Sequence, residues 1–131
     1  MITWRGRRFS KMAAGTCVLG VTGGIAAAKA SLLASMLTKS GFDVHVVMTR
    51  AACEFVAPLT FRTLTANPVS VDMFGEPDQW NVKHVSLAEA ADLFVVAPAT
   101  ANFLGKVASG IADDLLTTTI MATRAPVVIA P

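Results

Sequence analysis

A glycine-containing turn near the start of the chain has the residue types of a site for an anionic group. Residues 20–25 read Gly-Val-Thr-Gly-Gly-Ile and join an apolar, β-branched run to an alanine-rich stretch with helical spacing. Glycine permits positive φ angles and a close approach of the main chain to an anion, and a helix N-terminus adds N–H groups and partial positive charge. Thr22 can add a hydroxyl. We therefore predict a phosphate site here, with a tight turn that binds nothing as the alternative.

A second polar segment follows a strongly apolar run later in the chain. Residues 97–102 read Ala-Pro-Ala-Thr-Ala-Asn, so small side chains leave room for a ligand while Thr100 and Asn102 offer hydrogen bonds. An ordinary helix cap would have the same composition. Taken alone, this segment leaves both interpretations open.

His84 is chemically suitable as a general base, because an unperturbed imidazole has a pKa near neutrality. It lies two residues before Ser86, which opens a Ser-Leu-Ala-Glu capping box. His45 falls within an apolar run, where a structural role is expected. Asp113 and Asp114 fall in a predicted helix, on a solvated or hydrogen-bonded face rather than at a cation site. No metal site is predicted, and the residues alone leave both a catalytic and a non-catalytic His84 open.

The elements that must position these residues alternate between strand and helix. Strands are predicted over residues 16–21, 44–48, 93–97 and 127–130, with a weaker one at 69–71. Helices are predicted over residues 25–39, 50–56, 60–66, from residue 86 onward, and over 102–123 with a break near Gly110. This alternation predicts an α/β fold with a parallel sheet and right-handed crossovers. Ligands bind such sheets at the carboxyl ends of the strands, which would gather residues 20–25, 49–50 and 97–102.

Several residues predict where the helices begin and end. Gly41 sits where a C-terminal cap belongs, and Thr49 can cap the short helix that follows it. Pro58 is expected to break that helix, and Thr60 to cap the next one. Residues 75–82 are expected to form a loop.

The composition indicates one compact domain with much buried surface. The chain has 131 residues, of which 53% are apolar and 15% charged. A parallel sheet buried on both faces and a subunit interface would both explain this balance. The net charge is +2, and much of the excess lies in residues 1–15, which we expect to be a disordered basic leader. We expect neither a nucleic-acid nor a membrane partner. Cys17 and Cys53 are expected as free thiols in a reducing compartment.

Six segments, taken in order, resemble the homo-oligomeric flavin-containing cysteine decarboxylase family. They are residues 21–27, 47–49, 58–61, 84–88, 97–102 and 110–116. The resemblance runs from about Cys17 to Pro131. It implies a Rossmann-like FMN-binding domain over residues 16–131, a parallel sheet with helices on both faces, in a cytoplasmic homotrimer or a multiple of trimers. The likeness is strongest to the branch that serves coenzyme A biosynthesis, which implies FMN-dependent loss of CO2 from a small cysteine-derived acid.

The resemblance also implies roles for particular residues. His84 matches the active-site histidine and would act as the base. The matching cofactor-binding positions are Gly23, Gly24 and Ile25 at the FMN phosphate, with Thr22 beside them, Thr49 at the flavin, and Pro98, Ala99, Thr100, Ala101 and Asn102 along the cofactor.

One departure from the family pattern concerns the substrate side of the site. Family members continue from the last strand into a Pro-x-Met-Asn motif and later into a flexible lid, whereas Ala130 and Pro131 match only the start of that motif. We therefore expect a C-terminally truncated domain. A peptidyl-cysteine decarboxylase and a non-catalytic flavin-binding regulatory subunit remain alternatives. An NAD-dependent dehydrogenase is disfavoured, because Thr49 and Arg50 follow the second strand where an acidic residue would be needed.

Overall fold

The computed structural model describes residues 14–71 and 80–131, with side chains described from residue 85 onward in the second part. Residues 1–13 of the predicted leader lie outside the described residues. Most of the loop predicted over residues 75–82 lies outside them too, and its last residues, from Trp80, are helical.

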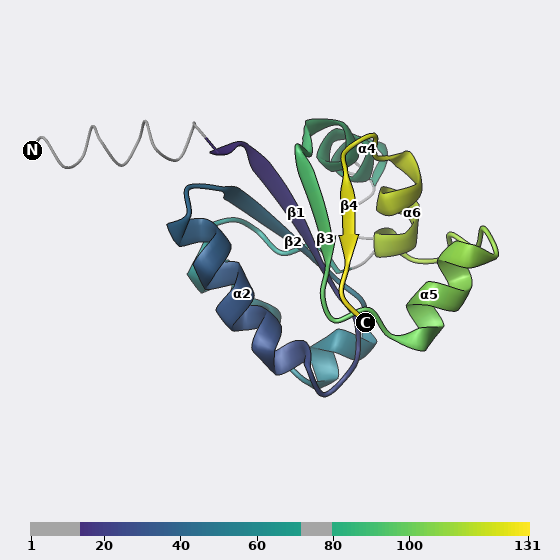
Figure 1. Ribbon diagram of the computed structural model, residues 1–131, viewed down its shortest axis with the longest axis horizontal. Coiled ribbons are helices and arrows are strands. Elements are labelled where there is room, and N and C mark those ends of the chain that lie inside the picture. Colours follow the sequence, from purple (N-terminus) through teal and green to yellow (C-terminus); the bar gives the residue numbers. More distant parts are fainter. Residues whose placement is uncertain (1–13, 72–79) are drawn as a thin grey trace, which may run out of the picture.

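Four parallel strands form a single sheet in the order β2-β1-β3-β4 (Figure 1). They are β1 (Thr16–Val21), β2 (Asp43–Met48), β3 (Leu93–Val96) and β4 (Val127–Ile129). The predicted α/β class and all four principal strands are therefore confirmed. The weaker strand expected at residues 69–71 is reduced to an isolated bridge between Ser70 and Val47.

Helices cover both faces of the sheet (Figure 1). On one face lie α2 (Ala27–Lys39), the short 3-10 helix η1 (Ala51–Glu54) and α3 (Pro58–Thr65), and α2 packs against α3. On the other face lie α4 (Trp80–Ala90), α5 (Ala101–Ala108) and α6 (Leu115–Ala122), with α6 packed against α4 and α5. Each crossover between neighbouring parallel strands thus carries helical structure, as parallel pairing requires.

Side chains of the central strand alternate between two apolar cores. Cys17, Leu19 and Val21 of β1 point into the core under α2 and α3, whereas Val18 points into the core under α5 and α6. All four side chains are fully buried. Burial on both faces is why β1 is a continuous apolar run in the sequence rather than an alternating pattern.

The predicted end of the first helix is confirmed in detail. Gly41 has φ +97°, its N–H donates to the carbonyl of Thr38, and the N–H of Phe42 donates to that of Leu37. This pair of bonds is a Schellman motif, in which a left-handed residue, usually glycine, satisfies the last carbonyls of the helix. Thr49 also caps as predicted, since its hydroxyl oxygen accepts from Ala52 N–H at 3.2 Å.

Three other predicted helix boundaries are wrong. Pro58 occupies the first turn of α3 instead of breaking a helix, because the missing N–H of proline is tolerated there, and Thr60 lies inside α3. Ser86 lies inside α4, which begins at Trp80. The Ser-x-x-Glu pattern marks a helix start only when the preceding residues are not already helical.

The helical stretch predicted over residues 102–123 is divided into two helices, which confirms the predicted break near Gly110. Gly110, with φ +72°, follows the end of α5, and α6 begins only after Asp114. Asp113 and Asp114 therefore lie in the connection and not on a helix face, which corrects the prediction for both. Within the described ranges, no helix has the length and apolar character needed to cross a bilayer.

Candidate functional site

The candidate site lies at the carboxyl ends of β1 and β3, where the sheet order reverses. From β1 the chain crosses to β2 on one side and later returns to place β3 on the other side. At this topological switch point the loops that leave β1 and β3 run in opposite directions. Ligands bind parallel sheets in the crevice between two such loops. The turn after β1 and the segment after β3 are thus neighbours, as the sequence predicts.

A cavity of about 600 Å³ opens at this edge. Five of the predicted cofactor-binding residues line it: Thr22, Gly23, Thr49, Thr100 and Asn102. Its remaining lining residues are Arg50, Ala51, Val71, Phe103, Lys106, Asp113, Asp114 and Leu115. The other predicted cofactor-binding residues lie in the same two loops but not on the cavity lining: Gly24, Ile25, Pro98, Ala99 and Ala101.

The N-terminus of α2 meets the requirements of an anion site. Among the described residues no side chain caps it, and its first turn holds no acidic residue. A helix start of this kind leaves main-chain N–H groups and partial positive charge available to an anion. Thr100 caps α5 and Asp114 caps α6 at the same edge of the sheet, so α2 differs from both.

Close packing, rather than backbone conformation, explains Gly23 in this turn. Positive φ is found at Gly15, Gly41 and Gly110 among the described glycines, and not at Gly23 or Gly24. A Cβ on Gly23 would lie 2.4 Å from the Cβ of Ala51, where η1 begins. Gly23 thus lets the loop after β2 approach the turn after β1, and the positive φ that glycine permits is not used at this turn.

Thr22 connects the two central loops through its hydroxyl group. The hydroxyl donates to the carbonyl oxygen of Pro98 at 2.5 Å and accepts from the N–H of Thr100 at 3.0 Å. The peptide bond between Ala97 and Pro98 is cis. Thr22 itself is 1% exposed. The hydroxyl hydrogen is therefore used inside the protein, and not toward the cavity.

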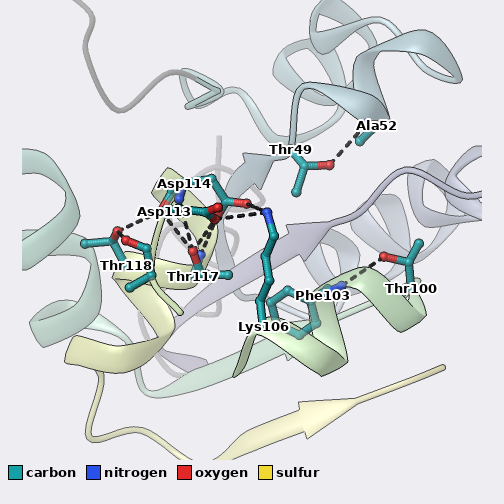
Figure 2. Close-up of polar contacts among 10 residues, drawn as sticks. Thr49, Ala52, Thr100, Phe103, Lys106, Asp113, Asp114, Thr117 and Thr118 are labelled. Atoms are coloured by element: carbon teal, nitrogen blue, oxygen red, sulfur yellow. Dashed lines mark hydrogen bonds and ion pairs between the residues drawn. The ribbon is translucent and has the colours of Figure 1, made fainter. Parts of the chain in front are cut away.

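Two other threonines present hydroxyl groups at the cavity (Figure 2). The Thr49 oxygen accepts from Ala52 N–H and the Thr100 oxygen accepts from Phe103 N–H at 3.3 Å. Neither hydroxyl hydrogen has an acceptor among the described residues. Both remain available as donors to a ligand.

A cluster of three charged residues forms the wall of the cavity between α5 and α6 (Figure 2). Lys106 Nζ lies 2.9 Å from Asp113 Oδ1 and 4.0 Å from Asp114 Oδ2. The hydrogen bond that Lys106 donates to Asp113 raises the pKa of Lys106, although desolvation acts in the opposite direction. Asp114 accepts from Thr117 N–H at 2.7 Å, and its own N–H donates to the Thr117 hydroxyl at 3.2 Å, which completes a capping box.

Sequence reasoning did not assign these three residues to the site. Lys106 lies four positions after Asn102, and residues at this spacing share one face of a helix. That spacing could have placed Lys106 beside the predicted site. Asp113 and Asp114 could be placed only once it was known that the predicted break near Gly110 extends to Asp114.

His84 belongs to α4, but its side chain lies outside the part of the chain that the structure describes. Its role as a base stays a prediction. His45 lies in β2, where its Nε2 is 3.0 Å from Asp43 Oδ2 at the strand's amino end, consistent with a structural role.

The chain matches a family model described as Flavoprotein over residues 8–131. It is 53% identical over 114 residues to the coenzyme A biosynthesis bifunctional protein CoaBC of Bacillus subtilis (strain 168), and 46% identical to that of Vibrio cholerae serotype O1. These alignments cover 87% of this chain and 28–29% of the relatives. The chain thus spans less than a third of the length of these curated relatives.

Solved structures with the same fold include two decarboxylases. The FMN-dependent cysteine decarboxylase TvaF from thioviridamide biosynthesis is 32% identical with a TM-score of 0.82, covering 90% of this chain and 73% of that one. A PPC decarboxylase mutant, C175S, complexed with pantothenoylaminoethenethiol is 29% identical with a TM-score of 0.71, covering 88% and 65%.

Proposed function

The chain belongs to the Flavoprotein family, and we propose that it is the FMN-binding decarboxylase part of a coenzyme A biosynthesis protein. Its reaction is the conversion of 4'-phosphopantothenoylcysteine to 4'-phosphopantetheine with loss of CO2, which makes it a carboxy-lyase. The observation that carries this proposal is the 53% identity to the Bacillus subtilis CoaBC protein across 87% of the chain. The small-molecule substrate and a cytoplasmic location belong to the same proposal.

The described residues fit FMN on three physical grounds. A cavity of about 600 Å³ falls within the range of roughly 300–1,000 Å³ that holds small-molecule ligands. The uncapped start of α2 offers N–H groups to a phosphate. The hydroxyl groups of Thr49 and Thr100 provide donors for polar atoms of the cofactor.

Each loop of the site would hold a different part of FMN. Gly23, Gly24 and Ile25 would lie against the phosphate at the start of α2, where the Gly24 N–H donates to the carbonyl of Thr22 at 3.1 Å and so is already used inside the turn. Thr49 would contact the flavin from the loop after β2. The segment from Pro98 to Asn102 would line the cofactor, with Thr100 and Asn102 as its hydrogen-bonding members.

Bound FMN would supply a reversible two-electron oxidation of the cysteine side chain, which lets the neighbouring carboxylate leave as CO2. The protein's contribution is to bind, orient and move protons. His84 would act as the base that accepts a proton from the substrate, since an imidazole exchanges protons near neutral pH. This assignment is supported by the resemblance of residues 84–88 to the family's active-site segment.

A homotrimer, or a multiple of trimers, is the proposed assembly. Several large apolar side chains on the α2 and α3 side of the sheet are exposed. They are Ile25 (89%), just before α2, Leu32 (65%) and Met36 (57%) within α2, Phe55 before α3, and Leu59 within α3. Apolar side chains gathered on one side of a molecule commonly mark a protein interface. Ile25 adjoins the phosphate turn, so the cofactor site would border the interface. Native mass spectrometry measures the number of subunits directly, and a monomer at micromolar concentration would exclude the trimer.

A peptidyl-cysteine decarboxylase is the second candidate function. TvaF has the higher of the two reported TM-scores, and this chain covers 73% of it. The two candidates differ in substrate, one a phosphorylated pantothenoyl conjugate and the other a peptide with a C-terminal cysteine. Incubating the natural full-length flavoprotein with each compound and measuring CO2 distinguishes them. CO2 from neither compound would favour a flavin-binding regulatory subunit instead.

The visible absorption spectrum of the purified protein tests the cofactor claim. Flavin absorption bands that survive gel filtration are expected. A colourless protein that takes up no added FMN would contradict the proposal. In the natural full-length flavoprotein, His84→Asn should keep the flavin bands and lose CO2 release.

A further inference from the structure

The polar groups of the segment after β3 are satisfied from two directions. Toward the sheet, Ala97 N–H donates to Gly20 O at 3.0 Å and Ala99 N–H donates to Ala130 O at 2.8 Å. Toward the glycine turn, the contacts are with Thr22. Its hydroxyl donates to Pro98 O and accepts from Thr100 N–H, and its own N–H lies 3.3 Å from Pro98 O.

The Thr22 hydroxyl is buried at the place where the two loops meet. It makes one donor and one acceptor bond, both to main-chain groups 76 and 78 residues away. A nonpolar side chain here would leave Pro98 O with a weaker bond and Thr100 N–H without one. Leaving buried main-chain groups unpaired is unfavourable, so the loop after β3 would move to find other partners.

Movement of that loop would shift the groups that face the cavity. Thr100 is the N-cap of α5, and both Thr100 and Asn102 line the cavity. Gly23 follows Thr22 directly, on the other side of the same contact. The separation between the phosphate turn and the Thr100–Asn102 wall therefore depends on the Thr22 hydroxyl.

We infer that Thr22 is a positioning residue: its hydroxyl joins the glycine turn to the segment after β3 and so preorganises the two halves of the FMN site. This inference rests on the proposed function. It differs from the phosphate-donor role predicted from sequence, because the single hydroxyl hydrogen is directed to Pro98. Preorganised groups bind more tightly because they do not have to be ordered when the ligand arrives.

The test compares Thr22→Val, which keeps the side-chain shape, with Thr22→Ser, which keeps the hydroxyl. Thr119→Val is the matched control, because Thr119 is also fully buried and its hydroxyl donates to Leu115 O at 2.6 Å inside α6. The dissociation constant for FMN is measured by quenching of flavin fluorescence, at a temperature where circular dichroism shows every variant folded. Exchange of the Thr100 amide hydrogen in the FMN-free protein is measured by NMR.

Thr22→Val should weaken FMN binding by about ten- to a hundredfold and speed exchange of the Thr100 amide. Thr22→Ser should stay within about threefold of the wild type, and Thr119→Val should lower thermal stability without changing FMN affinity. If Thr22→Val does not fold, Thr22→Cys replaces it, since a thiol fills the site with only a weak donor.

Two outcomes would overturn the inference. One is wild-type FMN affinity in Thr22→Val or its cysteine replacement. The other is a loss of FMN affinity in Thr22→Ser as large as that in Thr22→Val, which would assign the effect to the threonine methyl group. A wild-type protein that binds no FMN contradicts the proposed function instead. In that case amide exchange at Thr100 still tests the connection between the loops.

Discussion

The ammonium of Lys106 lies 2.9 Å from a carboxylate oxygen of Asp113, across the connection between α5 and α6 (Figure 2). The Asp113 side chain is 57% exposed. An ion pair with an exposed member contributes little to stability, because solvent screens it. The pair lies on the cavity wall, however, where Lys106 balances the negative charge of Asp113 and Asp114 beside the proposed FMN site.

Lys106→Gln should weaken FMN binding by about two- to tenfold while the thermal midpoint stays almost unchanged. The substitution leaves the carboxylates of Asp113 and Asp114 without their cation, and they then repel the phosphate of FMN. The loss should shrink as salt is added, because ions screen this repulsion. Fluorescence titration at low and high salt measures both effects.

Two variants control the Lys106 measurement. Asp113→Asn removes a negative charge from the same wall, so it should leave FMN affinity unchanged or increase it. Lys39→Gln removes an exposed charge at the far end of α2 and should have no effect on binding. Equal FMN affinities in wild type and Lys106→Gln would show that the charge of this wall does not affect FMN binding.

Gly23→Ala should disrupt both the fold and the site. The added methyl group would meet Ala51 at 2.4 Å, and overpacking of this kind lowers the free energy of unfolding by about 1–3 kcal/mol. Gly105→Ala is the matched control, because its Cβ would point into open space on α5 and should stabilise the protein by about 0.5–1 kcal/mol. Urea denaturation measures both changes, and an unchanged Gly23→Ala would contradict the close packing of these loops.

Asp114→Ala should lower the free energy of unfolding by about 1 kcal/mol, because the variant loses the capping box that begins α6. Asp113→Ala is the adjacent control, since Asp113 caps no helix and should change stability less. Asp114→Asn, which can still accept from Thr117 N–H, should recover most of the loss. The same urea transitions give all three values.

Burial raises the pKa of the Cys17 thiol from 9.0 to about 11. The folded protein therefore keeps this thiol neutral at pH 9–10, where the unfolded chain ionises it. Stability from this group is complete below the unfolded pKa and is lost as pH rises through the folded value. Cys17→Ala should accordingly show a smaller decrease in thermal midpoint between pH 8 and pH 10.5 than the wild type. An identical decrease in both would assign the alkaline sensitivity to other groups.

The sheet and its site could be predicted from sequence because both follow from patterns that tolerate small errors. Buried parallel strands are continuous apolar runs, and β1 and β3 fall where those runs lie. Once these two strands are neighbours, the rule for switch points brings Thr22 and Thr100 together. Neither step depends on the precise start of a helix.

The missed parts depend on single residues and long-range contacts. Local propensity cannot show whether Asp114 continues a helix or caps one, and that choice decides whether Lys106 and Asp113 meet. It also cannot show that Ala51 approaches Gly23, because η1 and the glycine turn come from different crossovers. The sequence pattern suggested a ligand-facing hydroxyl for Thr22, whereas a contact 76 residues away uses its hydrogen.

The 76-residue separation between Thr22 and Pro98 also constrains the order in which the molecule can form. A nascent chain emerges from the ribosome with β1 and the glycine turn first, long before the segment they must meet. Contacts between distant parts of a sequence form slowly, because a long loop must close before they can stabilise anything. The site should thus be among the last features to appear during folding. Retention of the yellow cofactor would then report that a newly made chain has finished folding.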